Sequence, residues 1–249
     1  MVVKRLRELL LGLAILPAIA QPVLAHSIWI VTGENQGEYE IVYGHPERNE
    51  TEPYDSIKFQ AARAYAGNGM PLPLTVRREN DGVTLVSERG VAAVTASHNN
   101  GYFISVGENE SRNVFRLEAL ESNNEETEIS HTYKYAKAFY EPSPLVSQQF
   151  GLPLEIIPRQ NPYAVDAGET LQIQVLFQGK PQSGVTVVYG EEELKTNNNG
   201  IAVITLGKEE VPVIEAEYSI PSTDDEAADE IGYASTLAID KARSSFTRR

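Results

Sequence analysis

The sequence predicts an all-β protein built from two antiparallel β-sandwich domains. Short runs in which apolar and polar residues alternate follow one another, each bounded by Gly, Pro, Asn or Asp, which is typical of sandwich strands. No long stretch has a clear helical period; the weak exception, SHTYKYAKAFY at 130–140, fits either a short helix or a strand. Cysteine is absent, so stability must come from buried apolar area rather than disulfides.

Residues 1–25 are predicted to form a secretory signal peptide. Lys4, Arg5 and Arg7 precede an apolar run, and Val23-Leu24-Ala25 suits cleavage after Ala25. The alternative is an uncleaved membrane anchor, which an apolar core shorter than about 20 residues, interrupted by prolines, disfavours. We therefore expect an exported, periplasmic protein with no membrane insertion after cleavage.

The net charge of the chain limits the classes of binding partner that we expect. Removal of the signal takes three basic residues and one acid with it and moves the formal net charge from −14 to −16. So acidic a chain is a poor candidate for nucleic acid or anionic membrane surfaces and a better one for cations, soluble ligands or partner proteins.

The first predicted domain covers residues 26–147. Its expected strands, in chain order, are SIWIV, YEIVYG, IKFQAARAY, LPLTVRR, GVTLVS, AAVTAS and GYFISVG. The segment EPSPLVSQQF at 141–150 carries two prolines and breaks the pattern, which makes it the best candidate for a linker. We place the boundary at about residue 148.

The second predicted domain covers residues 148–249. Its expected strands are LPLEIIP, ETLQIQVLFQ, VTVVYG, IAVITLG, VPVIEAEYSI and GYASTLAI, with turn signals QGKPQSG and TNNNG between them. This layout resembles Ig-like, transthyretin-like and carboxypeptidase-regulatory-like modules over about 80 residues, which implies a fold but no chemistry. The acidic segment at 221–230 lacks the ligand spacing of an EF-hand loop and is interpreted as a solvated loop.

The four histidines are the main candidate metal ligands in a chain without cysteine: His26, His45, His98 and His131. Cleavage after Ala25 would give His26 a free α-amine, which with imidazole Nδ1 forms a chelating pair that releases protons to a divalent cation near neutral pH. An incidental terminal residue is the alternative.

His45 lies in YGHPERNETEPYD, where Gly44 and Pro46 would hold its imidazole at a strand end. Glu47, Glu52 and Asp55 follow as possible oxygen ligands or as partners for a ring N–H. A purely structural turn histidine is the alternative.

The other two histidines are weaker candidates. His98 is expected at an exposed hairpin tip, whereas His131 lies beside a tyrosine-rich segment. The candidate metal set is therefore His26, His45, His131 and Asp55. No catalytic nucleophile motif, P-loop or HExxH spacing occurs, so we do not expect an enzyme.

Four features together resemble one bacterial periplasmic family of unknown function. They are the signal followed by AHSIWI, the YGHPERNETEPYD turn, TYKYAKAFY, and GLPLEIIPRQNPYAVDAGETLQIQVLFQGKPQSGVTVV. The family is linked to nickel and cobalt uptake and is often labelled a periplasmic component of energy-coupling-factor-type transporters. The resemblance implies Ni²⁺ or Co²⁺ as the bound cofactor and a membrane transporter component as partner, and it carries the family's histidines onto His26 and His45.

Two other function classes stay open. The chain could be a scaffold or adhesion protein of the cell envelope, or a carbohydrate- or polymer-binding module if several of its twelve tyrosines and Trp29 line one groove. N/O ligation also suits Cu²⁺ and Zn²⁺. The distance between His26 and His45 distinguishes metal binding from these alternatives. If the two residues lie more than about 12 Å apart, no single ion can bridge them at imidazole ligand distances.

Overall fold

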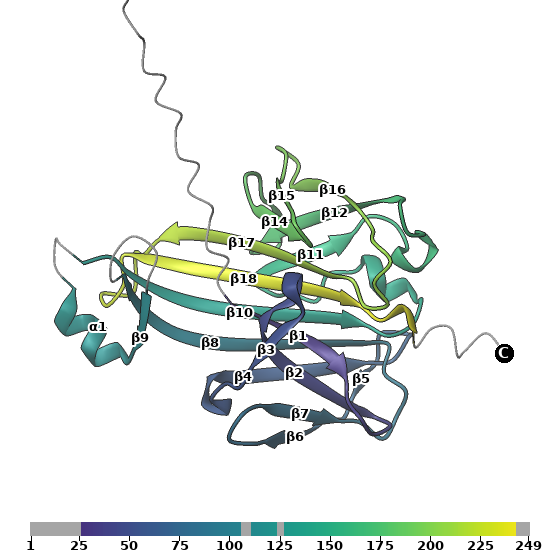
Figure 1. Cartoon of the computed structure of the whole chain (residues 1–249), viewed down its shortest axis with the longest axis horizontal. Helices are drawn as coiled ribbons and strands as arrows, with labels where there is room; N and C mark the ends of the chain where they lie inside the picture. The colour runs from purple at the N-terminus through teal and green to yellow at the C-terminus, as the bar shows by residue number, and fades with distance from the viewer. Residues whose placement is uncertain (1–25, 106–110, 124–126, 243–249) are drawn as a thin grey trace, which may run out of the picture.

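The computed structural model describes residues 26–105, 111–123 and 127–242 (Figure 1). Strands dominate these residues, which confirms the predicted all-β sandwich class. The predicted signal peptide lies outside the described residues. Within the described part of the chain, no helix is both long and apolar enough to cross a membrane.

The first sheet is antiparallel and contains the start of the described chain. Its order is β1-β2-β7-β6, and β3 pairs with the far end of β2. Its strands are β1 (Ser27–Thr32), β2 (Glu38–His45), β3 (Glu50–Glu52), β6 (Thr75–Arg78) and β7 (Val83–Val86).

The central sheet has nine strands in the order β15-β14-β17-β18-β10-β8-β4-β5, and β9 pairs with β8. These strands are β4 (Phe59–Tyr65), β5 (Pro71–Leu72), β8 (Ala93–Ser105), β9 (Ser111–Val114), β10 (Ile129–Phe139), β14 (Thr186–Tyr189), β15 (Glu192–Lys195), β17 (Val213–Pro221) and β18 (Glu230–Ile239). The ambiguous segment at 130–140 is thus a strand, and it pairs in parallel with β18. One sheet therefore contains strands from both sides of the boundary expected near residue 148.

The third sheet covers the other face of the central one. Its strands are β11 (Leu154–Pro158), β12 (Thr170–Phe177), β13 (Lys180–Pro181) and β16 (Ile201–Thr205), with β12 in the middle. Helical elements are short: α1 (Arg116–Ser122), η1 (Pro46–Arg48), η2 (Ser56–Lys58), η3 (Pro144–Ser147) and η4 (Pro162–Ala164).

Strand β10 serves two hydrophobic cores because successive side chains of a strand point to opposite faces. Tyr135 and Phe139 pack with residues of the third sheet, among them Leu154. Ala136 and Ala138 face the first sheet and pack with its buried residues. The small alanines let β1 lie close against the central sheet.

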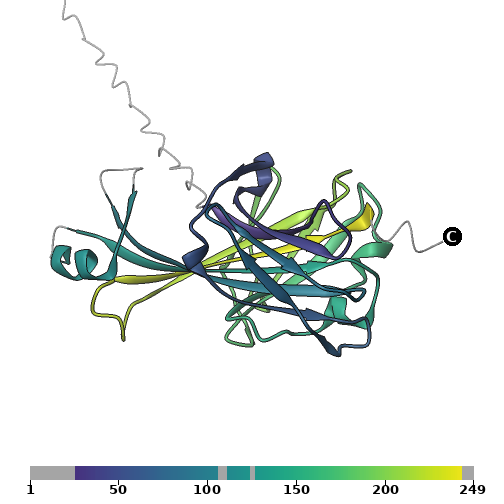
Figure 2. The ribbon, with the colours of Figure 1, turned by 90° about the horizontal axis from the view of Figure 1, so that it is seen from below.

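The central sheet also projects beyond both outer sheets. Figure 2 shows β8, β10 and the ends of β17 and β18 forming an arm that carries β9 and α1. A third, smaller core fills this arm and includes Tyr102, Ala119 and Ile129. Phe115 and Leu117 at the start of α1 are exposed.

A buried ion pair ties the central sheet to the third sheet. Lys137 Nζ on β10 lies 2.8 Å from Glu155 Oε1 on β11, and both side chains are almost fully buried. The Glu155 carboxylate also accepts hydrogen bonds from the backbone N–H groups of Phe150, Gly151 and Leu152. The pair thus fixes the chain where it leaves the first half of the fold and enters β11.

We expect Glu155→Gln to lower the free energy of unfolding by about 3–5 kcal/mol, because it leaves the Lys137 ammonium buried without a counter-charge. Urea denaturation at pH 7 measures this loss. Glu118→Gln, in the exposed Arg112–Glu118 pair, is the matched control and should cost less than about 1 kcal/mol. Equal losses in the two variants would show that burial does not set the contribution of the Lys137–Glu155 pair.

Candidate functional site

His26 and His45 lie in direct ring contact. Their ring centroids are 4.4 Å apart with the rings tilted by 44°, so the pair is well inside the distance that one ion can bridge. The contact follows from the pairing of β1 with β2, in which Ser27 opposes Gly44. Gly44 has φ +147°, and a Cβ there would lie 2.2 Å from the Glu50 carbonyl oxygen, so only glycine lets β3 approach this end of β2.

Each of the two imidazoles turns one nitrogen toward a carboxylate. His26 Nε2 lies 3.2 Å from Glu52 Oε1, and His45 Nδ1 lies 3.3 Å from Glu47 Oε1. Neither contact is aligned as a hydrogen bond, and both nitrogens are buried. Among the residues that the structure describes, His26 Nδ1 and His45 Nε2 have no carboxylate at ion-pair distance. The His26 ring also stacks on Tyr43, with centroids 5.0 Å apart and planes 2° apart.

Two buried ionisable residues of the central sheet, Lys134 and Glu215, lie below the start of β1. Lys134 Nζ donates a hydrogen bond to the His26 backbone carbonyl oxygen. Burial lowers the pKa of Lys134 to about 8, although Glu217 and Glu215 favour its charged form. Burial likewise raises the pKa of Glu215 to about 8, a rise that a hydrogen bond with Ser27 opposes.

Tyr43 lies close to Lys134 and to a second lysine. The ammonium groups of Lys58 and Lys134 are 6.0 and 5.9 Å from the centroid of its ring. Burial raises the pKa of Tyr43, and a hydrogen bond with Asn100 opposes the rise. Lys58 Nζ donates to Asn100 Oδ1 at 3.3 Å, so the phenol and the two lysines share one polar network.

His98 is a core residue rather than the exposed hairpin tip expected from the sequence. It lies within the long strand β8, its ring is fully buried against Tyr54 and Phe59, and neither ring nitrogen has a hydrogen-bond partner. Burial lowers its pKa to about 3, and the neighbouring cations Lys134, Lys58 and Arg78 add to the effect. His98 is therefore a neutral imidazole at pH 7.

Asp55 has a local structural role. Its side chain caps η2 by accepting a hydrogen bond from the Ile57 N–H at 2.9 Å. Within the described residues it contacts neither His26 nor His45. The carboxylates that the structure brings to these histidines are Glu47 and Glu52, which the same turn supplies.

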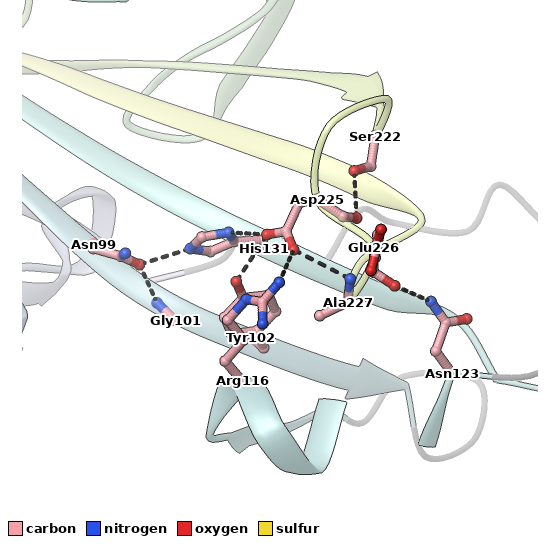
Figure 3. Close-up of polar contacts among 10 residues, drawn as sticks. All are labelled: Asn99, Gly101, Tyr102, Arg116, Asn123, His131, Ser222, Asp225, Glu226 and Ala227. Carbon is pink, nitrogen blue, oxygen red and sulfur yellow. Dashed lines mark hydrogen bonds and ion pairs between the residues drawn. The ribbon is translucent and has the colours of Figure 1, made fainter. Parts of the chain in front are cut away.

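His131 belongs to a different cluster on the projecting arm (Figure 3). Its Nδ1 lies 2.8 Å from Asp225 Oδ2 and its Nε2 lies 2.9 Å from Asn99 Oδ1. Asn99 Oδ1 also accepts from the Gly101 N–H, which identifies it as the oxygen of the amide. Both imidazole nitrogens therefore face acceptors, and neither is left to ligate a metal.

Asp225 holds this cluster together. Tyr102 donates to Asp225 Oδ2 at 2.8 Å and stacks on the His131 ring. Burial disfavours the Asp225 carboxylate, but hydrogen bonds from Tyr102 and His131 outweigh burial and lower its pKa. Burial and the adjacent Asp225 raise the pKa of Tyr102 to about 12. The segment expected to be a solvated loop thus attaches to β8 and β10 through Asp225, and Asp229 adds a second attachment by accepting from the Ile129 N–H of β10.

No group of three or more His, Asp or Glu side chains is arranged to hold a metal ion in the described ranges 26–105, 111–123 and 127–242. The two histidines at the start of β1 and the end of β2 are the closest approach to such a group among the predicted ligands.

Fold and site together define an all-β sandwich protein with a histidine pair at the start of its first strand. Residues 23–220 match the family described as Domain of unknown function (DUF4198), and the chain belongs to that family. The match confirms the predicted membership of a family of unknown function; it carries no link to nickel or cobalt. No curated protein matches the chain, and no solved structure matches it.

We expect Asp225→Asn to lower the free energy of unfolding at pH 7 by about 1–3 kcal/mol, since hydrogen bonds to a charged acceptor are lost. The pKa of Asp225 is lower in the folded chain than in the unfolded one, so its contribution is present above pH 4 and disappears as the pH falls through the folded value. Urea midpoints of the variant and the native chain should therefore converge in acid. Asp224→Asn, an equal charge change at an exposed neighbour, should leave the midpoint unchanged at every pH.

We expect the free energy of unfolding of His98→Leu to fall less steeply than that of the native chain as the pH drops below 6.5. The folded pKa of His98 is about 3, below the ordinary value of 6.5, so the unfolded chain binds the extra proton and native stability falls between these values as the pH drops. The slope from this one group is at most about 1.4 kcal/mol per pH unit. Urea denaturation at pH 7 and pH 4.5 measures it, and an unchanged slope in the variant would contradict a buried neutral His98.

Proposed function

We propose that the mature protein binds one divalent transition metal ion, nickel or cobalt, through His26 and His45 and delivers it to a membrane uptake system. The observation that carries the proposal is the contact between the two imidazole rings at 4.4 Å. Two histidines, one just before β1 and one at the end of β2, meet there, and imidazole is a good ligand for borderline divalent ions.

The freed α-amine completes the donor set. Two imidazoles are one donor short of a three-ligand site, and cleavage after Ala25 would create a third donor on His26 itself. The amine and Nδ1 of one residue close a chelate ring, and His45 Nε2 adds the second imidazole. The hydrogen bond from Lys134 to the His26 carbonyl supports this arrangement because it holds the backbone of the terminal residue in place.

Glu47 and Glu52 suit the role of outer partners. Histidines that bind metals generally donate their other ring N–H to a carboxylate, which fixes the tautomer and orients the ring. Glu52 lies beside His26 Nε2 and Glu47 beside His45 Nδ1, so the nitrogens proposed to bind metal are the opposite ones.

The choice of metal rests on the family resemblance drawn from the sequence. A three-nitrogen donor set holds Cu²⁺ more tightly than Ni²⁺ or Co²⁺ in the general affinity order. The proposed action is capture without catalysis in the periplasm, followed by transfer when a membrane partner offers competing ligands. The strongly negative net charge favours encounter with cations.

The test is calorimetric titration of the chain that begins at His26 with Ni²⁺, Co²⁺, Cu²⁺ and Zn²⁺, in parallel with a chain that carries one added glycine before His26. We expect at least one ion to bind with a stoichiometry of one, and the added glycine to weaken binding by at least about tenfold, because it removes the amine donor. Equal affinities would contradict the role of the amine.

Three variants of the mature chain locate the site. His45→Ala should abolish tight binding, and Glu52→Gln should weaken it by about 10–100-fold if the carboxylate orients His26. Asp55→Asn is the matched control from the same turn and should bind as the native chain does. Retained affinity in His45→Ala would overturn the proposed histidine pair.

A further inference from the structure

A groove of about 590 Å³ lies between the central sheet and the third sheet. Tyr133 and Tyr135 of β10 and Tyr233 of β18 line it, with Leu152, Pro153 and Gln178 on the facing side. Because side chains alternate along β10, these tyrosines point away from the face on which Lys134 reaches His26. The groove is therefore separate from the histidine pair. We propose that it binds a neutral saccharide.

Aromatic rings form the floor of this tyrosine groove. Tyr133 and Tyr233 are register partners in the parallel β10–β18 pair, and their rings stack with planes 24° apart and centroids 6.1 Å apart. Phe177 packs edge-on against Tyr233 at 5.0 Å and supports that ring from the third sheet. Such neighbouring ring faces offer flat apolar area of the kind that the C–H faces of a pyranose cover.

The tyrosine hydroxyls supply polar contacts that the protein itself does not use. Within the described residues, none of the hydroxyls of Tyr133, Tyr135 and Tyr233 makes a hydrogen bond, although other tyrosines of the chain, such as Tyr102 and Tyr189, do. Burial raises the pKa of each of the three phenols, so each stays protonated and can both donate and accept. Three such groups in one groove match a ligand rich in hydroxyls.

The lack of charged residues in the lining of the tyrosine groove favours a neutral ligand. No residue that lines the tyrosine groove is charged, in a chain whose net charge is −14. Two carboxylates lie close to the lining, and both already have partners in the protein. Glu155 accepts from the N–H groups of Gly151 and Leu152 and is buried in its ion pair with Lys137. Asp225, at the Tyr133 end, is hydrogen-bonded to His131. An anionic or cationic ligand would lose hydration here without gaining a counter-charge, whereas a neutral polyol would not.

Gln178 adds an amide at the rim. It is one of two non-glycine residues with positive φ in the described chain, at +50°, in the tight turn that joins β12 to β13. Its N–H donates to the Pro153 carbonyl oxygen at 2.7 Å, which ties the turn to the neighbouring segment on the same side of the groove. This left-handed backbone conformation is energetically less favourable for glutamine than for glycine. Non-glycine residues in such conformations cluster at binding sites.

The test uses the mature chain and measures binding of cellohexaose, maltohexaose and hexa-N-acetylchitohexaose by isothermal titration calorimetry, with tri-galacturonate as the charged comparison. We expect at least one neutral oligosaccharide to bind, with an affinity that salt does not change, and tri-galacturonate not to bind. Binding of none of the neutral probes, or equal binding of tri-galacturonate, would overturn the proposal.

Variants place that binding in the groove. Tyr233→Phe keeps the ring and removes one hydroxyl, so affinity should fall about two- to tenfold. Tyr133→Ala removes a ring face and should weaken binding by at least about tenfold. Tyr163→Phe, outside the groove, is the control and should bind as the native chain does, and His26→Ala should too, since this site does not depend on the metal. Native affinity in both Tyr133→Ala and Tyr233→Phe would overturn the proposal, and far-UV circular dichroism confirms that each variant is folded.

Discussion

The parallel pairing of β10 with β18 joins residues that stand 100 positions apart, from Ser130 with Glu230 to Phe139 with Ile239. A two-residue turn cannot connect parallel strands, so the whole third sheet is inserted between them as the connection. That insertion places one sheet on each face of the central one. Both hydrophobic cores, the histidine pair and the tyrosine groove depend on this single alignment.

The alternation of apolar and polar residues predicted where the strands lie better than it predicted how they pair into sheets. Alternation alone locates β2, β12 and β16, because each has one face buried and the other more exposed. It cannot show that β10 faces two cores, since Tyr135 and Ala136 are both apolar and read as a continuous run. Local patterning likewise contains nothing about a partner strand 100 residues away, so a sheet that crosses the expected boundary near residue 148 could not be predicted from it.

The same contrast between local pattern and long-range assembly applies to the candidate site. The turn YGHPERNE contains His45, Glu47 and the glycine that the crossing of β3 requires, so local chemistry was enough to single it out. His98 and His131 could not be assigned in this way. Their surroundings come from distant segments of the chain: Lys58 and Tyr54 around His98, and Asp225 beside His131. A polar residue in an acidic loop gives no local sign that it will pair with a histidine 94 residues earlier.

The first residues of the described chain accept hydrogen bonds from β10 and β18 of the central sheet. The His26 carbonyl accepts from Lys134 on β10, and the Ile28 carbonyl accepts from Thr236 on β18. These two contacts span 108 and 208 residues, so β1 has its complete docking surface only once β10 and β18 have paired. The β1–β2 hairpin that brings His26 to His45 is local in the sequence, but the surface that holds it in place is assembled from distant parts of the chain.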